Sequence, residues 1–117
     1  MEEMINKLEI ECNAVESACK EHGYKTARLD DCRNTILELR RYKSAPQTGK
    51  QREILLRGAA LSYESLAGVY GDIAVTIMIK SITKSLRALE EAQRYAEELM
   101  EAKERCFRRM HILVEVI

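Results

Sequence analysis

The sequence is poor in residues that break helices or build special loops. Its 117 residues include one proline, one phenylalanine, no tryptophan and five glycines that lie apart from one another. Isolated glycines exclude the glycine-rich loops that cradle phosphates, and no serine or cysteine has a histidine at the spacing of a known nucleophile motif. The chain also lacks a low-complexity segment or a linker that could separate two domains. We therefore expect one domain spanning residues 1–117.

An excess of charge of either sign is also missing. Nineteen Lys and Arg offset nineteen Asp and Glu, so no overall field attracts nucleic acid or an anionic membrane. The charges are nevertheless unevenly spread. Residues 1–24 carry six Glu against two Lys, whereas residues 25–57 carry nine basic residues against four acidic ones. The basic middle of the chain is therefore its candidate polyanion-binding region.

No strictly apolar run approaches the ~20 residues of a membrane-spanning helix, and the first residues lack the basic start and apolar core of a signal peptide. We expect a cytoplasmic protein without a membrane segment, whose four cysteines are reduced and pack as small apolar residues. Cys12 and Cys19 would lie about 10 Å apart along a helix, too far to share a tetrahedral zinc site. We predict no metal and no cofactor.

Helical periodicity is the strongest pattern present. Between residues 72 and 117, apolar positions recur at alternating steps of four and three, and only Gln93 and Lys103 interrupt them. A second set at steps of seven widens the stripe to the face of a bundle helix with coiled-coil heptads. We call the first set the main column: Val75, Ile79, Ile82, Leu86, Leu89, Gln93, Ala96, Met100, Lys103, Phe107, Met110, Val114 and Ile117. The second column is Met78, Ser85, Ala92, Leu99, Cys106 and Leu113.

The rest of the chain predicts three shorter helices, at residues 2–22, 26–43 and 48–70. Gly23 ends the first, and Pro46 lies in the loop after the second. Thr48 and Gln51 have capping-box spacing at the start of the third. Gly71 followed by an aspartate is typical of the end of one helix and the start of the next, so we place the last helix at 72–117. The predicted fold is all-α, a four-helix bundle-like domain with a long C-terminal amphipathic helix.

Two alternatives remain for the last helix. Alternation of branched residues from Ile73 to Ile79, and the β-branched residues near the C-terminus, would also suit strands at the edge of a sheet. The helix could instead be broken and fold back near residues 81–85. The heptad pattern runs through all of these segments, which favours one continuous helix.

Helix lengths predict self-association. At ~1.5 Å per residue, residues 72–117 would extend roughly 69 Å, about twice as far as the longest of the other three helices. The uncovered end would expose a larger apolar strip than soluble monomers usually tolerate, and an antiparallel two-fold dimer would cover it. Lys103 could fix the register of that dimer or reach a glutamate of the partner. The predicted contact residues are Leu99, Met100, Lys103, Phe107, Met110, Leu113, Val114 and Ile117.

The basic residues between positions 40 and 57 suggest an alternative function. They gather around Pro46, where they could contact the phosphates of RNA or DNA, although Tyr42 is the one aromatic residue among them. A solvated charged surface, or contact with the acidic first helix of a neighbour, are the other interpretations. The candidate polyanion-binding residues are Arg40, Arg41, Lys43, Lys50 and Arg52.

Arg105 and His111 have five residues between them. This spacing resembles the arginine-to-histidine motif of the HEPN ribonucleases, compact helical domains of about this size. The resemblance implies that the two side chains act on an RNA phosphodiester. It covers seven residues, and the family normally has more of the final helix after the pair than the six residues that remain here. Ordinary surface positions beside the apolar stripe are the competing interpretation.

Three glutamates in the last helix, Glu97, Glu98 and Glu101, are similar to the first acidic cluster of the all-α nucleoside triphosphate pyrophosphohydrolases. That resemblance implies carboxylates that hold Mg²⁺. The family needs a second acidic pair on a following helix, which this chain does not supply, so a solvated charged face is favoured. The sequence as a whole favours a non-enzymatic helical protein that binds other proteins and assembles with itself through its C-terminal helix.

Overall fold

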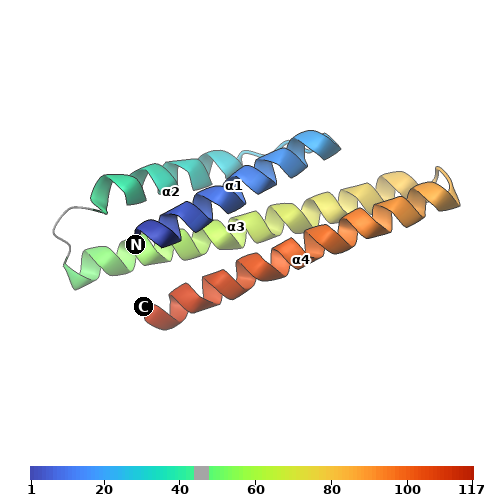
Figure 1. Ribbon diagram of the computed structural model, residues 1–117. Helices are drawn as coiled ribbons and strands as arrows, with labels where there is room; N and C mark the ends of the chain where they lie inside the picture. Colours follow the sequence, from blue (N-terminus) through green and yellow to red (C-terminus); the bar gives the residue numbers. More distant parts are fainter. Residues whose placement is uncertain (44–47) are drawn as a thin grey trace.

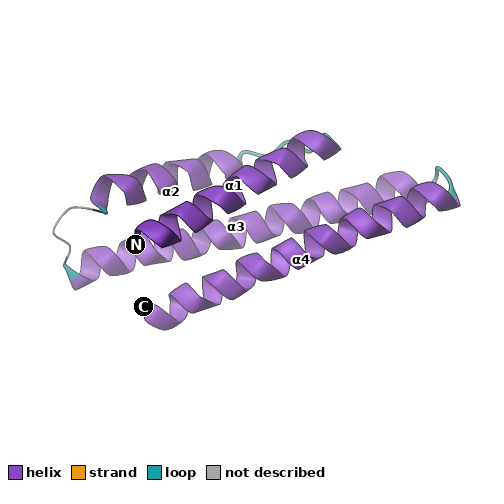
Figure 2. Ribbon diagram, in the orientation of Figure 1, coloured by secondary structure: helices purple, strands orange, loops and turns teal. Residues whose placement is uncertain are grey.

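Four α-helices form the described part of the chain, and each runs antiparallel to the one before it (Figure 1). The computed structural model describes residues 1–43 and 48–117. Within those ranges there is no strand, so the prediction of an all-α bundle is confirmed and the strand alternatives are wrong (Figure 2). The helices are α1, Glu2–His22; α2, Arg28–Tyr42; α3, Gly49–Ile82; and α4, Leu86–Val116.

The longest helix, α3, lies at the centre of the arrangement. It packs against α1, α2 and α4, whereas no Cα atom of α1 comes within 8 Å of one in α4 across the described residues. Both chain ends lie at the same end of the molecule, and the α3–α4 hairpin extends past α1 and α2 at the other (Figure 1). Small buried residues of α3, including Ala59 and Ala67, allow this close packing.

The predicted helix break at Gly71 is wrong, because α3 continues to Ile82. Gly23 is the one glycine in the described ranges with a positive φ, at 64°, so Gly71 has no left-handed conformation that would end a helix. Its missing side chain instead makes room for Lys103, whose Nζ would lie 3.1 Å from a Cβ at this position. Asp72 is not a helix cap either: its carboxylate accepts hydrogen bonds from Arg28 and from Tyr24.

The chain reverses direction around Thr83 and Lys84, within the segment that the alternative prediction named. Ser85 is the N-cap of α4 and accepts a hydrogen bond from the backbone N–H of Ala88 at 3.1 Å. The continuous helix predicted over 72–117 is therefore two arms of a hairpin. Because α3 contains 34 residues and α4 contains 31, the predicted uncovered length of the last helix does not exist.

The boundaries of the other helices are close to those predicted. The first is confirmed at Glu2–His22, and Gly23 takes the left-handed conformation after it. The second begins two residues later than predicted, although Thr26 accepts a hydrogen bond from the N–H of Arg28 at 3.2 Å. Both hydrogen bonds of the Thr48–Gln51 capping box are present. Most of the predicted loop around Pro46 falls at residues 44–47, outside the described ranges.

By length and composition alone, α3 is apolar enough to cross a membrane. A central helix that packs against other helices passes the same test, because it too must be apolar on several sides. Packing against three neighbours is what α3 does here. This packing accounts for the buried part of its apolar surface, whereas Val75, Ile79 and Ile82 remain exposed.

Glycine substitutions can test the continuity of α3. Gly71→Ala should raise the free energy of unfolding by about 0.5 kcal/mol, because alanine favours a helix interior and the flexible end of Lys103 can move aside. Gly23→Ala should lower it by about 1 kcal/mol, because φ at that position is 64°. Urea titrations followed by circular dichroism measure both changes. A loss of about 1 kcal/mol in Gly71→Ala would instead indicate that the helix ends there.

Candidate functional site

The apolar stripe of α4 divides between the core and the surface. The second column packs against α3, with Ala92, Leu99, Cys106 and Leu113 all buried. The main column lies on one flank of this buried line and is left half-buried or exposed. The column predicted to form the helix seam is therefore the one that the rest of the chain covers only in part.

The predicted contact residues of α4 fall into three groups. Leu99 and Leu113 are buried inside the chain itself, and Phe107 and Met110 are half-buried against the core. Three others remain accessible: Met100 is 42% exposed, Val114 54% and Ile117 39%. Self-association itself stays a prediction. Its premise of a bare helix end is wrong, but an uncovered apolar strip remains along α4.

Lys103 finds contacts for its stem and its charge within its own chain. Its aliphatic stem lies over Gly71 of α3, and its Nζ is 5.9 Å from the centroid of the Phe107 ring. That distance suits a cation–π contact. Lys103 thus covers part of the hairpin with its stem and leaves the apolar side chains on either side of it accessible.

The opposite flank of α4 is tied to α1 by a buried carboxylate. Glu11 of α1 is 2% exposed and accepts two hydrogen bonds from Arg105, at 2.6 and 2.9 Å. Arg109 donates to it at 3.0 Å, and the Tyr70 hydroxyl of α3 donates at 2.8 Å. Long side chains therefore join α1 and α4, although the backbones of these two helices are not in contact. We call these four residues the Glu11 cluster.

Charge and burial act against each other at Glu11. Removing the carboxylate from water disfavours its charged form, but hydrogen bonds from Arg105 and Tyr70, with the charges of Arg105 and Arg109, outweigh this and lower its pKa. Burial raises the pKa of the Tyr70 phenol, and its bond to Glu11 raises that pKa further. Glu11 is therefore an ionised acceptor and Tyr70 a neutral donor.

The residues that resemble the HEPN motif are not brought together. The guanidinium of Arg105 is directed at Glu11, whereas His111 is exposed. Positions six apart on an α-helix differ by about 120° around its axis, so the two side chains point to different sides. Arg105 has a structural role that the sequence interpretation missed. Removing it would disturb folding as well as any reaction, so His111→Ala is the cleaner test of ribonuclease activity.

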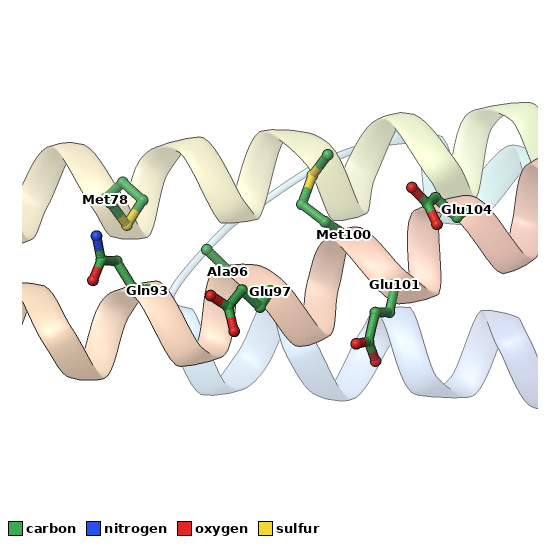
Figure 3. Close-up of a pocket in the computed structure, with 7 residues that line it drawn as sticks. All are labelled: Met78, Gln93, Ala96, Glu97, Met100, Glu101 and Glu104. Carbon is green, nitrogen blue, oxygen red and sulfur yellow. The ribbon is translucent and has the colours of Figure 1, made fainter.

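A groove opens between α3 and α4 on the flank away from α1 (Figure 3). Its volume is about 530 Å³, and Met78, Ala96 and Met100 supply its apolar surface. Three glutamates border it, Glu97, Glu101 and Glu104, together with Gln93. Met78 comes from α3, so the sequence could place it here only with the correct position of the chain reversal. We call this feature the acidic groove.

The candidate polyanion-binding residues are partly engaged within the chain. Arg40 donates to Glu9 at 2.8 Å, and Lys43 lies 3.4 Å from Glu2. Arg41 lies over the Tyr42 ring, at 5.8 Å from its centroid, while Lys50 and Arg52 are exposed near the start of α3. The acidic first helix thus meets this basic region inside one molecule, whereas one of the alternatives drawn from the sequence placed that contact between neighbouring copies.

The four cysteines are buried as free thiols, as predicted from their positions on the apolar stripes. Burial raises the pKa of Cys32 to about 11 and that of Cys106 to about 12, so both are protonated near neutral pH. Over residues 1–43 and 48–117, no three His, Cys, Asp or Glu side chains gather as metal ligands would. The three glutamates of the acidic groove therefore do not form a metal cluster of that kind.

Comparison with known proteins finds no match: no family model, no curated protein and no solved structure is significantly similar to this chain.

Removing the charge of Glu11 tests the cluster. Glu11→Gln should lower the free energy of unfolding at pH 7 by about 3 kcal/mol, because it breaks a buried ion pair that joins two helices. The pKa of Glu11 is lower in the folded chain than its ordinary 4.5, so wild-type stability falls as the pH drops below about 4.5. The variant should lose less stability over that range, as urea unfolding at pH 7 and pH 3 would measure.

Glu9→Gln is the matched control, since Glu9 pairs with Arg40 at a half-exposed position. It should cost less than about 1 kcal/mol. Equal losses in the two variants would contradict the structural role assigned to Glu11.

Proposed function

We propose that this chain is a non-enzymatic helical assembly protein that binds copies of itself through its C-terminal helix. The partly exposed main column of α4 carries the proposal. A helix that packs on one neighbour needs one apolar line, and the second column of α4 already fills that need. The additional apolar line therefore fits a second contact.

The position of this line supports an intermolecular contact. One flank of α4 is joined to α1 by the Glu11 cluster, and its centre packs on α3. The main column lies on the remaining flank, with Met100 and Val114 exposed and Phe107 and Met110 half-buried. Exposed apolar strips of this kind mark interaction surfaces in soluble proteins.

The α3–α4 hairpin adds apolar surface at its tip. Val75, Ile79 and Ile82 are exposed along the end of α3, and Leu86 at the start of α4 is 72% exposed. A partner lying along α4 would reach these residues beyond the ends of α1 and α2. We place the protein in the cytoplasm as part of the proposal, because four buried free thiols suit a reducing compartment.

Sedimentation equilibrium at tens of micromolar should give a dimer or larger species. Phe107→Glu with Met110→Glu should dissociate it, because four charges would enter the interface of a two-fold dimer. Val114→Glu changes a more exposed position and should weaken association while circular dichroism stays unchanged. Ile10→Glu is the control, since Ile10 is also an exposed apolar residue but lies on α1. A monomeric wild type would exclude the proposed function.

A further inference from the structure

The acidic groove has the chemistry of a site for a basic, apolar helix. Methionine side chains are flexible and polarisable, so Met78 and Met100 can adapt to the shape of an apolar partner. Glu97, Glu101 and Glu104 border the groove, and none of its lining residues is basic. An occupant should therefore present apolar side chains to the methionines and cations to the glutamates.

This chain itself contains such a segment, in the last turns of α4. Phe107, Met110 and Val114 are its apolar residues, and Arg108 and His111 lie between them on the exposed side. Residues 90–104 carry six Glu against two basic residues. Of the three arginines that follow, Arg105 and Arg109 donate to Glu11, and Arg108 is the one that is exposed. One helix thus carries an acidic groove on its first half and a basic apolar segment on its second.

We infer that the acidic groove binds the segment 107–114 of a second copy, and that the second copy's groove binds the same segment of the first. The inference rests on the proposed function and names the surface that the C-terminal helix meets. An antiparallel two-fold dimer centred near Lys103 produces both contacts at once. A parallel dimer would place the glutamates of one copy against those of the other.

Residues equally far from Lys103 in opposite directions face each other in this dimer. Ala96 lies seven residues before it, and Met110 seven residues after it, so each meets the other across the interface. Glu97 lies six residues before Lys103 and Arg108 five after, so in the dimer their levels differ by one residue, about 1.5 Å along the axis. The two positions are eleven residues apart and differ by only about 20° around α4, so both lie on the same side and opposite charges come together, whereas Glu98 points to another side. Lys103 at the centre is no obstacle, because its stem is turned toward Gly71 of its own chain.

Cysteine cross-linking tests the orientation. Ala96→Cys and Met110→Cys lie 14 residues apart, about 21 Å along α4, so they cannot form a disulfide within one chain. Neither single variant should cross-link with itself under mild oxidation, but a mixture of the two should give a covalent heterodimer. The native thiols are buried and should not react. Cross-linking of Ala96→Cys alone, or none in the mixture, overturns the inference.

Charge exchange tests the groove itself. Glu97→Arg and Arg108→Glu should each weaken dimerisation about tenfold, because each reversal acts at two symmetry-related contacts. The double variant should recover most of the affinity. Glu98→Arg is the matched control, because it makes the same charge change at a position outside the groove. Glu98 lies beside Tyr95, which contacts His22 of α1 on the other flank of α4.

The two proposals fail in different ways. A wild type that stays monomeric excludes both the assembly function and the groove contact. A dimer that Val114→Glu weakens, but that Glu97→Arg and Arg108→Glu leave unchanged, keeps the assembly function and excludes the acidic groove as the partner's site.

Discussion

Packing of α3 against every other helix is the contact on which the structure depends. The backbones of α1 and α4 do not meet, so both are held in place by the helix between them and by side chains that reach across. Continuation of α3 past Gly71 is what lets it cover α4, because an α3 that ended there would leave the first half of α4 without a partner. The same continuation brings Met78 to the groove that Met100 also lines (Figure 3).

Periodicity and capping signals in the sequence were sufficient to predict four helices, but not the position of the last reversal. Gly71 followed by Asp72 has the local pattern of a helix end, yet Gly68 and Gly71 lie inside α3 beneath side chains of other helices: Arg28 of α2 lies over Gly68, and Lys103 of α4 lies over Gly71. Such packing is invisible in one sequence. The true turn depends on Thr83 and on the capping hydroxyl of Ser85, a weaker signal than a glycine.

The apolar columns of α4 could be read from the sequence, but not which of them would be buried, since that depends on how α4 is rotated against α3. One feature of the sequence does point to the Glu11 cluster. Glu11 stands seven residues after Met4 and seven before Ala18, among positions that face inward. A charged residue on the inward face of a helix predicts a buried partner of opposite charge, but it does not indicate which residue that partner is. The partners Arg105 and Arg109 are 94 and 98 residues away along the chain, and only the fold brings them near.

Both ends of the chain lie at one end of the bundle, and this determines how the molecule would respond to being pulled. A force applied between Met1 and Ile117 would load the contacts between α1 and α4 one after another, as in unzipping, rather than all together in shear. Met4 and Leu113, which line one cavity near the two chain ends, would separate first, and the Glu11 cluster next. The two arginines would thus be the first strong mechanical resistance, and the contact between His22 and Tyr95 would open last.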